Sequence, residues 1–171
     1  MKARVLFAGC LALLAAVSVC GQTKVSGTLK CDKPEPRYSI EVGDRPGHVM
    51  VLEKEACTWA EALAIGSDKA KDAYSVASVD VTASRASGSG THVSTTEGGD
   101  KMFVTYRYAA PLKDGKTGEA HGTWSYTGGT GKLKGIKGGG TFKTTFGEDG
   151  TATTVVEGEY TLAQGAGAEK K

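Results

Sequence analysis

The chain has 171 residues, with 21 Lys and Arg against 19 Asp and Glu, which gives a formal net charge of +2 at pH 7. A charge so close to zero argues against nucleic acid as the main partner, because phosphate-backbone binding needs a surplus of basic residues on one face. The length fits one domain with a real hydrophobic core. We see no change of composition that would mark an internal domain boundary.

The first residues have the order of a secretory signal peptide. Lys2 and Arg4 precede an apolar run from Val5 to Val19, and a small residue follows at Gly21. This run is shorter than the roughly 20 residues that a transmembrane helix needs, and no later segment approaches that length. We therefore expect residues 1–21 to be removed as a signal peptide, which leaves an exported protein, periplasmic or secreted, without a membrane span. The loss of Lys2 and Arg4 leaves 19 basic residues (21 − 2) against 19 acidic ones.

An alternative to free export lies in the same segment. The residues from Val17 to Cys20 resemble the lipobox of bacterial lipoproteins, in which the cysteine carries acyl chains. Val19 stands where that motif has Gly, Ala or Ser. A lipid anchor at Cys20, and with it a membrane-anchored lipoprotein, therefore stays open as a second localisation.

Two cysteines, Cys31 and Cys57, lie outside the signal segment. In an oxidising compartment a single pair has only one intramolecular connectivity. Neither CxxC spacing nor a local catalytic signature supports a metal pair or a nucleophilic thiol. We predict a Cys31–Cys57 disulfide, which would stabilise the fold by about 3–4 kcal/mol through closure of a long loop.

Alternation of apolar and polar residues predicts short strands along most of the chain. The alternating apolar sets are Tyr38, Ile40 and Val42; Val79, Val81 and Ala83; Met102, Val104, Tyr106 and Tyr108; and Val156, Gly158, Tyr160 and Leu162. Asp114-Gly115 and Asp149-Gly150 lie between strand runs, where such pairs favour tight hairpin turns. Together these signals indicate roughly eight antiparallel strands in a barrel or sandwich.

Two segments depart from the strand pattern. Residues 60–73 are enriched in Ala, Glu, Leu and Lys but are interrupted by Gly66, so we expect a short helix or loop there. The Gly/Ala segment of residues 164–171 ends in charged residues, and we expect it to form a disordered tail.

The stretch from Gly118 to Phe146, GEAHGTWSYTGGTGKLKGIKGGGTFKTTF, places strand residues between glycines. Trp124 and Tyr126 share one face of a strand, and His121 lies on the other face, so the aromatic face is the natural interior. The GGTGK sequence is not a P-loop, because the required preceding glycine and following Ser or Thr are absent. It also lacks the third glycine of a dinucleotide-binding motif.

The segment from Gly122 to Phe142 resembles the GGTGxxxGxxGxG hairpin of the allene oxide cyclase and dirigent barrel superfamily. More closely, it is similar to small exported bacterial proteins of unassigned function, and the HV…GDK stretch from His92 to Lys101 adds to the likeness. The resemblance implies an all-β, antiparallel eight-stranded barrel over residues 22–163 whose interior can hold an apolar small molecule. Its cyclases act on a fatty-acid epoxide and its dirigent proteins steer phenolic radical coupling. Their polar interior residues have no identified counterpart here, so catalytic residues stay unknown.

Three functions remain open from the sequence. The first is a small-molecule binding protein without a cofactor, in which Trp124, Tyr126 and Tyr106 form an apolar wall and His121 serves as a polar anchor. The second is a cyclase- or isomerase-type enzyme that acts inside the barrel. The third is a non-catalytic envelope or interaction protein with a solid core.

Two further groups of residues favour structural interpretations. His48, His92 and His121 lack HxH or HxxxH spacing, so we expect surface or core histidines rather than a shared zinc site. The basic residues of the glycine-rich region form a stripe for which a solvated outer face is favoured over an anion site. They are Lys132, Lys134, Lys137 and Lys143.

Overall fold

The computed structural model describes residues 21–163. The apolar run of the predicted signal peptide, the alternative lipid anchor at Cys20 and the predicted tail lie outside the described residues. The strands are β1 (Thr23–Cys31), β2 (Arg37–Glu41), β3 (Val49–Ile65), β4 (Asp68–Val81), β5 (Arg85–Thr96), β6 (Lys101–Lys113), β7 (Lys116–Thr117), β8 (Ala120–Gly129), β9 (Lys137–Phe146) and β10 (Ala152–Thr161). A single 3-10 turn, η1 (Gly131–Leu133), lies between β8 and β9.

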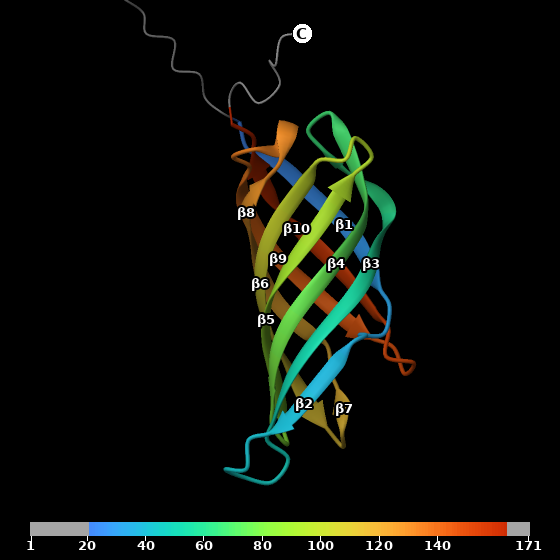
Figure 1. Ribbon diagram of the computed structural model, residues 1–171, viewed down its shortest axis with the longest axis vertical. Helices are drawn as coiled ribbons and strands as arrows, with labels where there is room; N and C mark the ends of the chain where they lie inside the picture. The colour runs from blue at the N-terminus through green and yellow to red at the C-terminus, as the bar shows by residue number, and fades with distance from the viewer. Residues whose placement is uncertain (1–20, 164–171) are drawn as a thin grey trace, which may run out of the picture.

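Eight of these strands close into an antiparallel barrel (Figure 1). The hydrogen-bonded order runs β1, β10, β9, β8, β6, β5, β4, β3, and β3 pairs back to β1. This confirms the all-β, eight-stranded antiparallel barrel predicted from the sequence. No helix of the described residues is both long and apolar enough to cross a membrane.

The seam between β1 and β3 is short and carries the disulfide. Register pairs across it are Leu29 with Trp59, Lys30 with Thr58, and Cys31 with Cys57. The two cysteines are therefore direct cross-strand partners, and their sulfur atoms form the predicted bond. Past the disulfide β1 ends, and the lower part of β3 pairs with β2 instead.

Strand β2 is an edge strand, and all five of its residues are exposed. The alternation of Tyr38, Ile40 and Val42 predicted a half-buried strand, which is wrong. Tyr38 and Ile40 are 63% and 72% exposed. The reason is that β2 pairs only with β3, so no second layer covers its apolar side chains.

The helix or loop expected near residues 60–73 is also absent. The segment forms the end of β3, a tight turn and the start of β4, in which Leu63 pairs with Ala70 and Ile65 with Asp68. Gly66 has a positive φ of 61°, which allows the turn. Helix-favouring composition loses here because both strands find hydrogen-bond partners and bury Leu63, Ile65 and Ala70 in the core.

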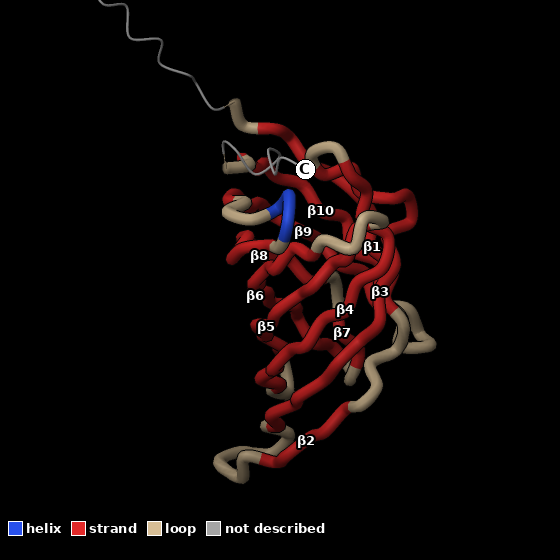
Figure 2. The backbone as a smooth tube through the Cα atoms, turned by 45° about the horizontal axis from the view of Figure 1, so that its top comes forward, coloured by secondary structure: helices blue, strands red, loops and turns tan. Residues whose placement is uncertain are grey.

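The upper end of the barrel is closed by the η1 turn, the single helical turn in Figure 2. Its Leu133, together with Ile136, is only 2% exposed. The GGTGK segment forms this turn, and the Lys132 amide donates a hydrogen bond of 3.0 Å to the Asp100 carboxylate. The acceptor of this amide in the GGTGK segment is therefore a side chain of the same protein. This agrees with the exclusion of a phosphate-binding motif.

The predicted hairpin turns are both present. Asp114 and Gly115 have positive φ angles of 51° and 73° between β6 and β7. Gly150 has a φ of 86° between β9 and β10, where the backbone amide of Thr151 donates to the Asp149 side chain. Positive φ in both connections is what their Asp-Gly pairs favour.

Glycines inside the strands make room for the large interior rings. Register pairs set Tyr108 opposite Gly88 and Tyr106 opposite Gly90, and Phe142 lies opposite Gly122. A Cβ at each of these glycines would collide with the ring opposite. The aromatic rings of the interior therefore pack against the backbone of these glycines rather than against side chains of the neighbouring strand.

Candidate functional site: a cavity inside the barrel

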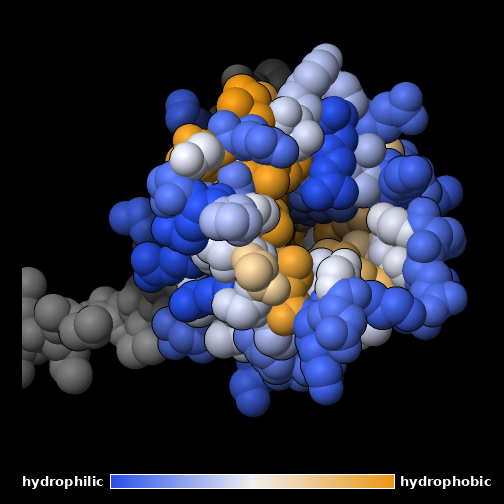
Figure 3. Space-filling view, turned by 90° about the horizontal axis from the view of Figure 1, so that it is seen from below, coloured by the Kyte–Doolittle hydropathy of each residue, from blue (hydrophilic) through white to orange (hydrophobic). Residues whose placement is uncertain are grey.

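The barrel is hollow, and a cavity of about 130 Å³ lies between its strands. Seen from below, the opening leads onto an apolar interior (Figure 3). Most of the lining is apolar or aromatic. Its apolar members are Val25, Leu29, Cys31, Trp59, Leu63, Ala77, Met102, Val104, Tyr106, Tyr108, Ala120, Trp124, Tyr126, Phe142, Phe146, Ala152 and Val156. The polar members are Glu53, Glu55, Ser75, His92, Ser94, Thr144 and Thr154.

The three aromatic residues predicted to form a wall do line this cavity. The rings of Trp124 and Tyr126 meet edge to face, with centroids 5.0 Å apart. Tyr106 makes a similar contact with Phe142 at 6.0 Å and a stacked contact with Tyr108 at 6.5 Å. Ligand binding by these residues stays a prediction, but their placement on one continuous aromatic surface agrees with it.

His121 does not reach the cavity. Its side chain is 69% exposed on the outside of the barrel, where it contacts Glu119 at 3.0 Å. Lys143 approaches the same carboxylate at 2.7 Å. The physical reason is strand alternation, because Trp124 points inward from β8 and His121 therefore points outward. His121 is not the polar anchor of the interior.

A buried chain of polar groups crosses the cavity wall instead. The Trp59 Nε1–H donates to Ser94 Oγ at 3.2 Å, and Ser94 Oγ lies 2.9 Å from His92 Nε2. His92 Nδ1 lies 3.0 Å from Ser75 Oγ. Because the indole can only donate and Ser94 is fully buried, the Ser94 hydroxyl donates to Nε2, and Nδ1–H donates to Ser75.

This hydrogen-bonded series ends at Ser75, which lines the cavity together with Tyr106. Burial lowers the pKa of His92 to about 4, so the imidazole is neutral at pH 7. Burial also raises the pKa of Tyr106, and nearby Glu55 raises it further. Both nitrogens of His92 are occupied by hydrogen bonds to Ser75 and Ser94, so His92 does not supply a free base to the cavity.

Two carboxyl groups face the cavity from β3. Burial raises the pKa of Glu53, which the Arg37 guanidinium at 3.4 Å partly offsets. Burial and the neighbouring Glu53 raise the pKa of Glu55 from 4.5 to about 7. Glu55 is therefore divided between its protonated and ionised forms at neutral pH.

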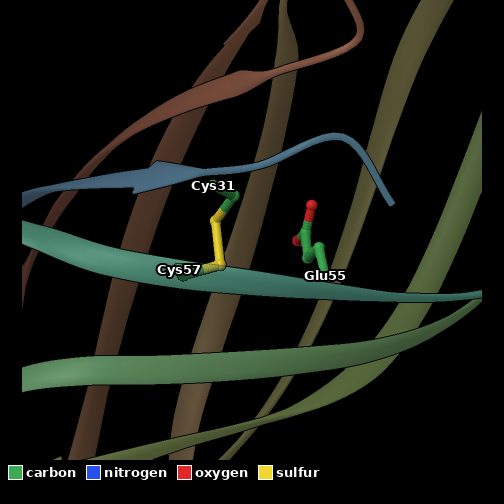
Figure 4. A group of neighbouring side chains, drawn as sticks. All are labelled: Cys31, Glu55 and Cys57. Atoms are coloured by element: carbon green, nitrogen blue, oxygen red, sulfur yellow. A yellow bond between two sulfur atoms is a disulfide. The ribbon is translucent and has the colours of Figure 1, made fainter. Parts of the chain in front are cut away.

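The disulfide forms part of the same wall (Figure 4). A carboxylate oxygen of Glu55 and the sulfurs of Cys31 and Cys57 all lie within 4.8 Å of one another. In this oxidised form the sulfurs are bonded to each other, so the trio does not offer thiolate ligands to a metal. Instead, it places an ionisable oxygen beside an apolar, polarisable surface.

The remaining candidates lie apart from the cavity or outside it. His48 sits at the lower end between Asp44 and Asp80, with ring nitrogens 2.5 Å and 3.3 Å from their oxygens, and the hydrogen bond to Asp44 raises its pKa. The three histidines thus occupy three separate environments. The basic stripe of Lys132, Lys134, Lys137 and Lys143 is exposed on the outer surface, as expected.

Sequence reasoning missed Glu53, Glu55 and His92 as cavity residues. A signal was present in β3, where every second residue from Val51 onward shares a face: Val51, Glu53, Glu55, Cys57 and Trp59. Cys57, if it pairs inside the barrel, identifies the interior face of this strand. Because side chains alternate along a strand, Glu53 and Glu55 must then point to the interior as well. They were overlooked because acidic residues in strands usually face solvent.

Comparison with known proteins gives fold-level likeness alone. No protein-family model matches this chain, and no curated protein matches its sequence. Among solved structures, a DUF3224-family protein of unknown function from Shewanella oneidensis MR-1 is 18% identical, with a TM-score of 0.46, over 84% of this chain and 98% of the other. The demethylase of pyocyanin is 15% identical, with a TM-score of 0.43, over 78% of this chain and 99% of its own.

A pterocarpan synthase dirigent protein is 13% identical, with a TM-score of 0.39, over 84% of this chain and 92% of its own. The eight-stranded antiparallel barrel that the resemblance of the Gly122–Phe142 segment implies is established by the strand pairing of this structure itself. Identities this low, with TM-scores below 0.5, say nothing about ligand or reaction.

Proposed function

We propose that this protein is an exported barrel that binds a small apolar molecule in its interior. The observation that carries the proposal is the cavity of about 130 Å³, lined by Trp124, Tyr126 and Tyr106 and open at the lower end. A barrel with a solid core would leave no such space. Export is supported by the Cys31–Cys57 disulfide, which suits an oxidising compartment.

The cavity volume limits the size of the ligand. Pockets for drug-sized molecules have volumes of about 300 Å³ or more, whereas an apolar cavity of about 150 Å³ holds a single benzene ring. The interior of this barrel is closest to the second case. We therefore expect a ligand with one ring, or a larger ligand that inserts one ring and leaves the rest at the mouth.

Intrinsic fluorescence can test this directly, because both tryptophans of the chain, Trp59 and Trp124, line the cavity. We expect titration with toluene to change the emission of the protein in a saturable manner. In Ala77→Leu the added side chain enters the cavity, and toluene should bind at least about tenfold more weakly. The matched control is Ala56→Leu on the outer face of β3, which should bind toluene as the unmodified protein does.

The natural ligand can be sought by native mass spectrometry of protein purified from its own source. A retained mass that disappears in Ala77→Leu would identify the occupant. Absence of toluene binding in the unmodified protein would sink the binding proposal.

Catalysis inside the barrel is the second candidate, and one observation favours it. Glu55 faces the cavity with a pKa of about 7, where a carboxyl can both donate and accept a proton at neutral pH. A cyclase or isomerase that uses this group would lose turnover in Glu55→Gln by at least about a hundredfold. Substrate binding should persist in that variant, which separates catalysis from binding.

A further inference from the structure

The charges inside the cavity are unbalanced. Its lining contains the carboxyl groups of Glu53 and Glu55, whereas no lysine or arginine lines it among the described residues. Its one histidine, His92, is held neutral by burial. Arg37 reaches Glu53 from the exposed edge strand β2, with its own side chain 56% exposed. The cavity lining therefore carries two carboxyl groups, and the one nearby cation, Arg37, pairs with Glu53.

Glu55 is the carboxyl group without a cationic partner. Within the described part of the chain no ion pair forms to it, and the charges that act on its pKa reduce to the like charge of Glu53. The disulfide sulfurs lie within 4.8 Å of its carboxylate oxygen, and Tyr106 and Tyr108 of β6 line the same cavity. An ionised carboxylate in such a place is costly unless an opposite charge joins it.

Aromatic rings line the same cavity as this carboxyl group. Tyr106, Tyr108 and Phe142 are among the lining residues; Tyr106 stacks on Tyr108, and Phe142 lies edge to face with Tyr106. Ring faces attract cations, most strongly where water is excluded. A carboxylate in a cavity lined by aromatic rings complements a protonated amine on an apolar body.

We propose that the ligand of this cavity is a small organic cation, an amine carried on one aromatic or apolar ring, with its ammonium group against Glu55 and its ring against Tyr106 and Phe142. This inference rests on the proposed binding function and adds the charge of the ligand. A carboxylate ligand such as a fatty acid would face two acidic groups in the same space. The raised pKa of Glu55 is what an empty cation site would show.

Three probes of nearly equal shape separate the possibilities: benzylamine, benzyl alcohol and benzoate. At pH 8 we expect benzylamine to bind at least about tenfold more tightly than benzyl alcohol, and benzoate to bind weakest. Binding is followed by the fluorescence of the two cavity tryptophans and by calorimetry. In Glu55→Gln the advantage of benzylamine over benzyl alcohol should disappear.

Two controls isolate Glu55. Glu61→Gln makes the same charge change at an exposed position of β3 and should leave the ratio of affinities unchanged. Glu53→Gln removes the carboxyl group that Arg37 already pairs with, so it should reduce the ratio less than Glu55→Gln does.

A pH titration tests the proposal without any substitution. Between pH 8 and pH 5.5 Glu55 becomes protonated, so benzylamine affinity should fall by about tenfold or more while benzyl alcohol affinity changes little. The other titratable groups of the cavity lining do not explain such a fall: Tyr106, Tyr108 and His92 stay neutral over this range, and Glu53 can only add to the same trend.

The outcomes distinguish this inference from the function on which it rests. Equal binding of benzylamine and benzyl alcohol, unaffected by Glu55→Gln, would overturn the cation and leave the binding of apolar molecules intact. Tighter binding of benzoate would overturn it in favour of an anionic ligand. If neither toluene nor any of the three probes binds, the binding function fails together with the inference.

Discussion

Glu55 is a partly buried ionisable residue whose placement in the cavity wall lowers the stability of the folded protein when it ionises. Its carboxyl group lies beside the disulfide sulfurs, and burial with a like charge nearby raises its pKa from 4.5 to about 7. A group of this kind destabilises the folded state when it must ionise. Buried ionisable groups with perturbed pKa values cluster at functional sites, which is why Glu55 is central to both candidate functions.

The pH dependence of stability follows from that pKa. Since the folded protein keeps the Glu55 proton up to about pH 7 and the unfolded chain releases it near 4.5, the stability contributed by this group falls as pH rises between these values. Glu55→Gln removes this effect. We expect its gain in unfolding free energy over the unmodified protein to grow by on the order of 2 kcal/mol between pH 5 and pH 8.

Urea unfolding at the two pH values measures this difference. Effects of other groups, such as the acid sensitivity that the lowered pKa of His92 gives, are common to both proteins and cancel. Glu61→Gln makes the same substitution at an exposed position of β3 and is measured as the control. A gain for Glu55→Gln that does not change with pH would mean that the Glu55 pKa is not raised.

At the scale of strands, the glycines explain how a narrow barrel holds so many rings. Gly158 on β10 lies beneath Trp124 of β8, whose indole N–H donates to the backbone oxygens of Thr141 and Glu157, both at 3.2 Å. The ring can approach the backbone this closely because no side chain intervenes. Gly158 is thus the complement of the Trp124 ring, and the two residues together shape this part of the cavity wall.

Replacement of one glycine tests this complementarity. A Cβ at position 158 would lie 2.6 Å from Trp124 Cζ2 and would also meet the backbone of Gly139. We expect Gly158→Ala to lower the free energy of unfolding by about 1–3 kcal/mol and to shift Trp emission as the ring moves. Urea unfolding followed by fluorescence measures both effects.

The control for this substitution is Glu159→Ala, which changes the next residue of β10 on its exposed face. It should stay within about 0.5 kcal/mol of the unmodified protein. If Gly158→Ala were equally neutral, the Trp124 ring could move without cost, and a glycine at position 158 would not be needed to hold the ring in place.

At the scale of the whole molecule, the barrel depends on one short seam. Strands β1 and β3 share three register pairs, the last of which is the disulfide. Below this point β3 pairs with the exposed strand β2, and the cavity opens (Figures 1 and 3). The disulfide therefore marks the place where the closed barrel ends and its mouth begins.

Removal of the disulfide should weaken this seam more than the rest of the barrel. The cross-link joins residues 26 positions apart in the sequence. The double variant Cys31→Ala, Cys57→Ala should lose about 3–4 kcal/mol of unfolding free energy. Hydrogen exchange should accelerate first in β1 and in the β3 residues opposite it, while the long β4–β5 pairing stays protected.

Comparison of the oxidised protein with the double variant by urea unfolding and amide exchange measures both expectations. Uniform acceleration over all strands would show that the disulfide acts on the whole barrel rather than on its seam.

The sequence by itself determined the class of fold. Period-two alternation, Asp-Gly turns and the glycine-rich hairpin are local features, so they predicted antiparallel strands and the turns at Asp114 and Asp149 correctly. The inward direction of Trp124 and Tyr126 also followed, because alternation within a single strand sets it. The cysteine pair was predictable since there was only one way to form it.

The tertiary structure decided what lies inside the barrel. Residues 60–73 became strand because neighbouring strands supplied hydrogen-bond partners that composition does not reveal. β2 is exposed because no second layer covers its apolar side chains, and the polar series from Trp59 through Ser94 and His92 to Ser75 forms only when three strands lie side by side. A cavity arises from the closure of eight strands and the fit of rings over glycines on other strands, so it is a property of long-range contacts that no local pattern encodes.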